Sequence, residues 1–328
     1  MVKQKKIGGV MYQIRTDLAL ETQEKMQEDK VDLKGVRFEE EEVDTNLVIS
    51  TVVIETENGA KTMGKPKGTY ITIEAGNMNE EDEGYHSEIS SQLARIIRRL
   101  IPVSKEELSV LVVGLGNRAV TPDSLGPRVV DNLYITRHIL NEYGKYAFGK
   151  EHTNCISSIA PGVMAQTGME SMEIVAAVVK ETKPDFVIAI DALAARNTKR
   201  LNRTIQVTDT GINPGSGVGN HRHAINEKSL GVPVLAIGIP TVVDAATIVN
   251  DTMTSLFTAL NANKDWNRIG NSVEELNQSE KYELIHELLS PGLNTMFVTP
   301  KDIDESVKRI SFTISEALNK VFLDEEVS

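Results

Sequence analysis

Two aspartates follow the most apolar segments of the chain and are the first candidates for chemistry. Asp123 lies in the loop after the apolar run Val110–Val113, and Asp191 directly follows the apolar run Phe186–Ile190. Continuous apolar runs of this length are typical of parallel strands that are buried on both faces. Because open α/β sheets bind their ligands at the carboxyl ends of such strands, we expect both carboxylates to lie in one crevice.

A close pair of carboxylates can perform acid–base chemistry. Repulsion between the two groups opposes ionisation of both, so the pKa of one rises and the pair can hold a shared proton. One member can then activate a water as a general base, while the other protonates a leaving group or polarises a carbonyl. The same pair could instead bind a divalent metal, with His221 and His223 as further ligands. The residue types leave both chemistries open.

Two other interpretations of Asp123 compete with these. As a structural residue, Asp123 could cap a helix that begins at Ser124. Alternatively, the segment Gly114–Ala119 fits the pattern G-x-G-x-x-G/A, which would make the protein a dinucleotide-binding regulator. The second interpretation is weak because Pro122 and Asp123 lie where the helix should already have begun, and because an anionic side chain is poorly placed beside a pyrophosphate.

A glycine-rich loop is the candidate for the substrate cleft. Residues Gly211–Gly219 follow a predicted strand, and backbone N–H groups in such a loop can bind a peptide backbone or an oxyanion. Ser216 within this loop lacks the spacing of a serine-hydrolase nucleophile. The residues that we expect to line the cleft are Asn117, Pro161, Gly162, Gly215, Ser216 and Gly217.

The elements that must position these residues alternate between strands and helices from about residue 108 onward. This alternation predicts an α/β fold with a mostly parallel sheet flanked by helices and right-handed crossovers. The acidic run Glu39–Glu42 is predicted to be a solvated loop, and Thr167 and Thr241 are predicted to begin helices through capping boxes. The predicted strands are 47–55, 69–74, 110–113, 154–159, 185–190, 201–207, 233–239 and 296–298, and the predicted helices span about 86–101, 125–144, 167–183, 241–261, 282–289 and 303 onward.

The chain divides into four predicted regions. Residues 1–14 form a lysine-rich tail, and residues 15–105 form an N-terminal segment with strands and a helix. Residues 106–262 form the α/β catalytic core, and residues 263–328 form a C-terminal extension packed on that core.

Composition limits the partners of the protein. The formal net charge of −12 argues against direct nucleic-acid binding, because phosphate contacts need a basic surface. No apolar run is long enough to span a bilayer, so we expect no membrane segment. The single cysteine, Cys155, excludes an intramolecular disulfide framework and fits a reducing, cytoplasmic compartment.

Several long motifs resemble the germination proteases (spore proteases) of endospore-forming bacteria, and the resemblance extends from about Ile14 to Asp302. The motifs are Ile14–Ala19, the block from Val112 to Pro127, Ala160–Met164, Ala189–Arg196, Pro214–Asn220, Ile237–Ala245 and Val298–Lys301.

The resemblance implies an endopeptidase of the spore core that degrades the small acid-soluble proteins coating spore DNA during germination. It also implies a fold similar to the hydrogenase-maturation proteases, with added elements, and a homotetramer. The family is regarded as atypical aspartic proteases whose two catalytic aspartates match Asp123 and Asp191, with no cofactor. A metal remains the alternative, since the related maturation proteases bind nickel. The family is made as a zymogen that cleaves itself near its amino terminus, and the tail before Ile14 or Arg15 matches that propeptide in position.

Overall fold

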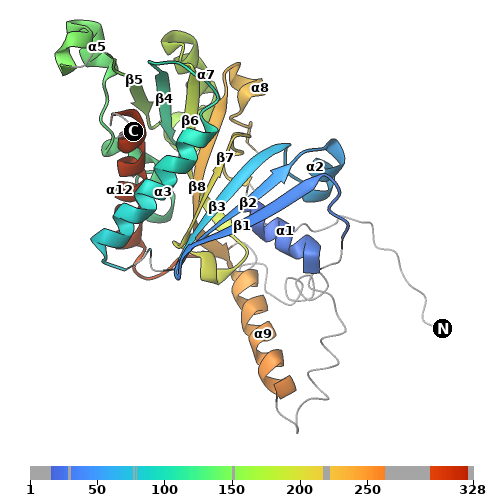
Figure 1. Cartoon of the computed structure of the whole chain (residues 1–328). Coiled ribbons are helices and arrows are strands. Elements are labelled where there is room, and N and C mark those ends of the chain that lie inside the picture. Colours follow the sequence, from blue (N-terminus) through green and yellow to red (C-terminus); the bar gives the residue numbers. More distant parts are fainter. Residues whose placement is uncertain are drawn as a thin grey trace.

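A computed structural model describes residues 16–28, 31–76, 78, 80–149, 152–216, 222–262 and 296–323 (Figure 1). The helix predicted at 282–289 and the tail 1–14 lie outside these residues. The strands are β1 (Val36–Asp44), β2 (Leu47–Ile54), β3 (Gly68–Ala75), β4 (Ser109–Gly114), β5 (Cys155–Ile159), β6 (Phe186–Ala195), β7 (Thr204–Thr208), β8 (Val234–Asp244) and β9 (Phe297–Val298). The helices are α1 (Ala19–Glu28), α2 (Glu57–Met63), α3 (Glu83–Leu100), α4 (Leu125–Asp131), α5 (Arg137–Tyr143), α6 (Met164–Thr167), α7 (Ser171–Thr182), α8 (Glu227–Leu230), α9 (Ala245–Ala262) and α12 (Ile303–Phe322), with 3₁₀ turns η1 (Thr121–Asp123), η2 (Lys145–Phe148) and η3 (Thr198–Arg200).

One sheet runs through the molecule in the order β1-β2-β3-β7-β8-β6-β4-β5, and β9 pairs with β8. Strands β8, β6, β4 and β5 are parallel to one another, and the other pairs are antiparallel. The predicted α/β class is therefore confirmed, with the parallel strands in one half of the sheet. The N-terminal strands continue this sheet through the pairing of β3 with β7, rather than forming a second sheet.

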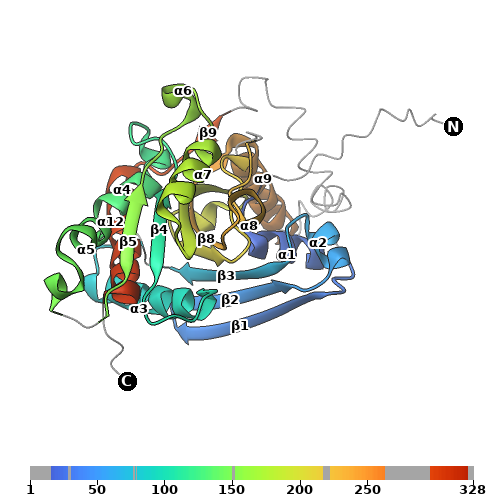
Figure 2. The same ribbon diagram turned by 90° about the horizontal axis from the view of Figure 1, so that it is seen from above.

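The parallel strands are buried on both faces, as their apolar runs predict. In β4, Val110 and Val112 pack in the core with α3, α4 and α12, whereas Leu111 and Val113 pack in the core with α7. Figure 2 shows α3 and α12 on one side of these strands and α7 and α8 on the other. Because successive side chains of a strand point to opposite faces, this double coverage requires an apolar residue at every position.

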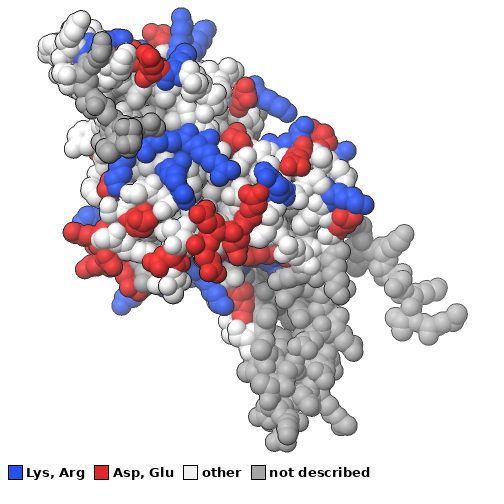
Figure 3. Space-filling view, in the orientation of Figure 1, with Lys and Arg blue, Asp and Glu red and all other residues white. Residues whose placement is uncertain are grey.

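The acidic run Glu39–Glu42 is part of strand β1, so its prediction as a loop was wrong. It pairs with β2 in antiparallel register, with Glu40 opposite Ser50. β1 is an edge strand whose glutamates are exposed, so the apolar alternation that reveals most strands is missing. Figure 3 shows acidic side chains beside basic ones on this face of the molecule, and Arg95 of α3 lies 3.9 Å from the Glu41 carboxylate.

The single helix predicted from Leu125 is two helices, α4 and α5. Between them the chain is tied to β5, because the Thr136 hydroxyl accepts a hydrogen bond from the Ile156 N–H (2.8 Å) and donates one to the Asn154 carbonyl (2.5 Å). These contacts with a distant strand outweigh the helical spacing of the local sequence.

Both predicted capping boxes were misplaced. Thr167 ends α6, and α7 begins only after Glu170, whose N–H donates to the Glu173 carboxylate (2.8 Å). Thr241 lies inside β8, which continues past Pro240 because the pairing with β6 shifts by one residue between Leu193 and Ala194. The longer β6 and β8 extend beyond the end of β4 and form one wall of the cavity described next.

Candidate active site

A cavity of about 360 Å³ lies at the carboxyl ends of β4 and β6. Both aspartates singled out in the sequence line it, one from each side. Its lining residues are Asp17, Leu115, Gly116, Val120, Pro122, Asp123, Val163, Ser171, Asp191, Ala192, Leu193, Ala194, Pro214, Gly215, Arg222, Thr241, Val242, Phe297 and Thr299.

Asp191 is the more deeply buried member of the pair. It lies within β6, which continues to Ala195, and the residue is only 5 % exposed. Its carboxylate accepts one hydrogen bond, from the N–H of Ala192 (2.9 Å). Burial raises the pKa of Asp191 well above its ordinary value, and the nearby charges of Asp123 and Asp17 raise it further. Asp191 is therefore the better candidate to hold the shared proton.

Asp123 ends the 3₁₀ turn η1 and faces back toward the end of β4. Its carboxylate accepts a hydrogen bond from the Asn117 N–H (2.8 Å), and Ser124, rather than Asp123, precedes α4. Burial raises the pKa of Asp123, while the Asn117 bond and the charge of Arg222 oppose the rise. The prediction that Asp123 caps the helix was therefore wrong, because its carboxylate bonds within its own loop.

The glycines of this loop permit a very close approach of backbone to backbone. Gly116 has a φ of +112°, and a Cβ built there would lie 2.0 Å from the Asp123 carbonyl oxygen. A Cβ on Gly126 of α4 would lie 2.4 Å from the Leu115 oxygen and 2.6 Å from the Ile190 oxygen. Helix α4 thus packs directly on the ends of β4 and β6. The loop 115–124 separates β4 from α4, so the glycine turn does not enter a helix directly as a dinucleotide fold requires.

A third carboxylate, Asp17, reaches the same cavity from the N-terminal segment. Its N–H donates to the Ala194 carbonyl (3.2 Å), and its carboxylate accepts hydrogen bonds from the Ala194 N–H (3.0 Å) and the Ser216 hydroxyl (2.7 Å). The side chains of Lys65 and Gln206 donate to the Asp17 carbonyl (2.9 and 3.2 Å). Analysis of residue patterns missed Asp17, because every one of these partners is far away in the sequence.

The residues after Asp17 are anchored in the fold. Leu18 is fully buried in a cluster with Leu193, Ala195 and Val243. Glu21 is also buried, which raises its pKa, and its carboxylate accepts hydrogen bonds from the N–H groups of Arg196 (2.8 Å) and Asn197 (3.0 Å). Because these partners directly follow β6, the segment is fixed beside Asp191.

Arg200 fixes the start of helix α1 to the rest of the sheet. Its guanidinium forms ion pairs with Glu24 of α1 (2.6 Å), Glu74 of β3 (2.8 Å) and Glu21 (3.7 Å). These bonds raise the pKa of Arg200, so the guanidinium stays charged although it is buried.

The loop after β7 contributes to the cavity from the opposite side. Gly215 lines the cavity, Ser216 binds Asp17, and Arg222 is the one cationic side chain among the described residues of the lining. Sequence analysis missed Arg222 because nothing in its local pattern marks it. Gly217 and His221 lie outside the described residues.

The remaining predicted cleft residues surround the cavity without lining it. The Asn117 carboxamide oxygen accepts hydrogen bonds from the Gln166 side chain (2.8 Å) and the Ala119 N–H (3.0 Å). Pro161 and Gly162 precede Val163, which does line the cavity. Asn117 thus links the Asp123 loop to α6.

His223 does not join the aspartates. Its Nδ1 lies 2.6 Å from the Glu170 carboxylate, which holds the side chain at the start of α7. Within the described part of the chain, no three His, Cys, Asp or Glu side chains form a group that could hold a metal ion. A metal bound by Asp123 and Asp191 therefore stays a prediction without a described third ligand.

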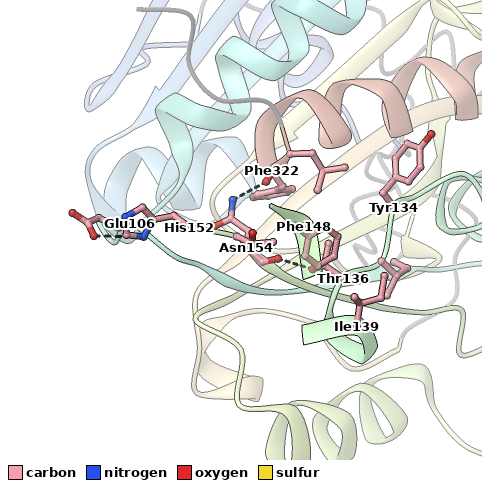
Figure 4. A pocket seen from close by; sticks show the side chains of 11 residues that line it. Glu106, Tyr134, Thr136, Ile139, Phe148, His152, Asn154 and Phe322 are labelled. Atoms are coloured by element: carbon pink, nitrogen blue, oxygen red, sulfur yellow. Dashed lines mark hydrogen bonds and ion pairs between the residues drawn. The ribbon is translucent and has the colours of Figure 1, made fainter. Parts of the chain in front are cut away.

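A second cavity, of about 470 Å³, lies at the opposite, amino-terminal edge of the parallel strands. Figure 4 shows its aromatic wall of Tyr134, Phe148 and Phe322. Its polar groups are largely occupied within the protein: Asn154, for example, donates to the Phe322 carbonyl (2.8 Å). Among its described lining residues Glu106 is the only carboxylate, so the cavity around Asp123 and Asp191 is the candidate active site.

The fold and the cavity define an α/β protein with a carboxylate pair at the carboxyl edge of its parallel strands. The sequence model of the germination protease family matches residues 14–273. Three relatives named germination protease are those of Caldanaerobacter subterraneus (48 % identical, 94 % of each chain), Clostridium perfringens (43 % identical, 94 % of this chain and 95 % of the relative) and Bacillus subtilis (39 % identical, 100 % and 98 %). The chain belongs to the germination protease family and is a protease.

A solved structure, the [NiFe] hydrogenase maturation protease HycI from Thermococcus kodakarensis, also matches. It covers 68 % of this chain and 99 % of its own, with 15 % identity and a TM-score of 0.32. Among the described residues, none of the helices has the length and apolar character needed to cross a membrane.

Proposed function

We propose that this protease is an endopeptidase of the spore core that begins the degradation of small acid-soluble spore proteins during germination. The observation that carries the chemical part of the proposal is the pair Asp123 and Asp191 in one cavity, each with a raised pKa. The substrate and the compartment are supported by the names of the relatives, which are germination proteases.

In the proposed mechanism the two carboxylates have unequal roles. Asp191, the more buried, holds the shared proton, while Asp123 acts as the base that takes a proton from the attacking water. The Asn117 N–H stabilises the ionised form of Asp123, because a hydrogen bond to a carboxylate favours its charge. An atypical aspartic protease thus needs no cofactor for this step.

We further propose that the protein is made as a zymogen and cleaves its own N-terminal segment. The support is positional: Asp17 enters the cavity that contains the aspartate pair, and Leu18 fills an apolar pocket beside it. Self-cleavage is then expected next to Asp17, slightly after the position suggested by the sequence.

The same contacts suggest which residues the protease prefers at the cleavage site of other substrates. The Asp17 carboxylate occupies a place with two donors, the Ala194 N–H and the Ser216 hydroxyl, which suits an acidic side chain. The pocket around Leu18 suits an apolar residue directly after it. Preferred substrates therefore carry an acidic residue followed by an apolar one.

The aspartate pair is tested by the substitutions Asp123→Asn and Asp191→Asn. Each should slow both self-processing and the cleavage of a small acid-soluble spore protein by about 10²–10⁴-fold, the usual contribution of one acid–base group. Intact-mass spectrometry measures both reactions and locates the cut. The variants should keep the circular dichroism spectrum of the native protein.

Normal self-processing by either folded variant would contradict the assignment. The metal-dependent alternative makes a different prediction, namely loss of activity in excess chelator and a stoichiometric metal in the purified chain. Full activity in chelator would remove that alternative and leave the metal-free mechanism.

A further inference from the structure

Arg222 is a cation in the catalytic cavity that has no counter-ion among the residues that the structure describes. It is partly buried and forms no ion pair or hydrogen bond with a described residue. Its charge nevertheless acts on the carboxylates of Asp123 and Asp191, and lowers the pKa of both against the effect of burial. Arg222 lines the same cavity as the two carboxylates and forms no ion pair with either, so its guanidinium can contact a substrate bound in that cavity.

Two sets of contacts hold the described residues beside Arg222. Ile212 and Ile225 exchange two backbone hydrogen bonds (2.9 and 2.8 Å). Next to Arg222, both the N–H and the Nδ1 of His223 bind the Glu170 carboxylate (3.1 and 2.6 Å). Arg222 is therefore held at the cavity by its neighbours rather than by a salt bridge of its own.

We propose that Arg222 is a catalytic residue whose guanidinium stabilises the oxyanion formed during peptide hydrolysis; this inference rests on the proposed function of the aspartate pair. As Asp123 takes a proton from water, the new C–O bond forms and the electron pair of the carbonyl moves to its oxygen, beside Arg222. When the C–N bond breaks, the oxygen pair re-forms the carbonyl and the amine takes the proton of Asp191. The proton on Asp123 then passes to Asp191, which restores the starting state of the pair, so all atoms and charges balance.

A competing role would be to bind the acidic side chain of the substrate. The structure already provides two donors for that carboxylate, the Ala194 N–H and the Ser216 hydroxyl, and Arg222 forms no ion pair with Asp17. The guanidinium is therefore available for the reacting carbonyl oxygen.

The test is a double-mutant cycle on self-processing of the full chain, with Arg222→Gln, Asp17→Asn and the two combined. The first-order rate of N-terminal cleavage is followed by intact-mass spectrometry. Loss of an oxyanion donor should slow cleavage by about 10²–10³-fold, and by the same factor whether residue 17 is Asp or Asn. Added guanidinium should restore part of the rate of an Arg222→Ala chain. Arg118→Gln is the matched control, because Arg118 is exposed, paired with Asp131 and outside the cavity lining.

Each outcome decides between the roles. A rate for Arg222→Gln equal to that of wild type, or an effect that vanishes in the Asp17→Asn chain, would overturn the oxyanion role. A slow Arg222→Ala chain that melts like wild type but does not respond to guanidinium would also count against it. If Asp123→Asn and Asp191→Asn cleave normally, the proposed function fails instead, whatever Arg222 does.

Discussion

At the scale of single residues, three carboxylates line the cavity, and each accepts few hydrogen bonds from the protein. Among the described residues, the carboxylate of Asp191 has one hydrogen-bond donor, that of Asp123 has one, and that of Asp17 has two. Burial raises the pKa of Asp123 and of Asp191. Burial of these carboxylates is unfavourable for folding, but it favours the protonated form that the proposed acid–base chemistry needs.

The unfavourable burial of the Asp191 carboxylate predicts how the stability of the protein depends on pH. The folded-state pKa of Asp191 lies above its ordinary value of 3.8, so the folded protein binds more protons than the unfolded chain between the two values. Stability is therefore lost as the pH rises from about 4 through the folded pKa. In the Asp191→Asn variant the side chain at residue 191 cannot ionise. The variant should melt a few degrees above wild type at pH 7, and the difference should disappear below pH 4.

Differential scanning calorimetry across this pH range measures the effect, with Asp131→Asn, an exposed carboxylate of α4, as the control. A lower melting temperature for Asp191→Asn at pH 7 would mean that its carboxylate stabilises the fold.

At the scale of elements, the site depends on how closely α4 approaches the strand ends. Gly126 lies in a helix, where alanine would gain about 1 kcal/mol in helix propensity. A Cβ there would, however, meet the backbone oxygens of Leu115 and Ile190 at 2.4 and 2.6 Å, and backbone cannot yield as a side chain can. We expect the steric effect to dominate.

Gly126→Ala should therefore destabilise the protein by about 1–3 kcal/mol, as overpacking does, and slow cleavage by moving Asp123 away from Asp191. Urea unfolding and the self-processing rate are the measurements. Gly84→Ala serves as the control, because Gly84 is exposed in the first turn of α3 and its Cβ would contact only the Asp82 carboxylate, at 3.3 Å. Equal stability of the two variants would show that α4 can shift without affecting the site.

The elements also show which parts of the fold were predictable from the sequence. Strand β4, the first half of β6 and helix α3 were located correctly, because strands buried on both faces and a one-sided helix leave clear local patterns. β1 was missed because an exposed edge strand has no such pattern. The end of β8 was missed because a bulge in its pairing with β6 carries the strand past Pro240.

The same distinction applies to the site. Asp123 follows strand β4 and Asp191 follows the apolar run at the start of β6, so the rule for ligand sites in open α/β sheets was enough to predict that they meet. Asp17 reaches the cavity through hydrogen bonds with Ala194 and Ser216. Arg222 is held there through the bond between its neighbour His223 and Glu170. Only the folded chain reveals these contacts. The sequence therefore predicts site residues that follow apolar runs of a strand much better than site residues that lie in loops.

At the scale of the whole molecule, one continuous sheet joins the N-terminal strands to the catalytic half. Its outer edge is β1, whose exposed glutamates oppose the pairing of two copies of this strand by repulsion. The homotetramer expected from the resemblance must therefore use other surfaces.

Native mass spectrometry of the purified chain should give a mass four times the 36.1 kDa of one chain. At low salt concentration the tetramers should not associate further through β1, because the repulsion between its exposed glutamates is then least screened. A monomer at micromolar concentration would contradict the expected assembly.

The anchoring of the segment Leu18–Glu21 has a kinetic consequence. Cleavage next to Asp17 would leave Leu18 as the new N-terminus, still buried beside Leu193 and still followed by Glu21 in its bonds to the end of β6. The apolar pocket around Leu18, beside the catalytic cavity, would then be occupied by the enzyme's own product. A freshly processed protease would behave as a product complex. Its cleavage of a foreign substrate would begin after a lag, whose length is set by the release of the segment that begins at Leu18.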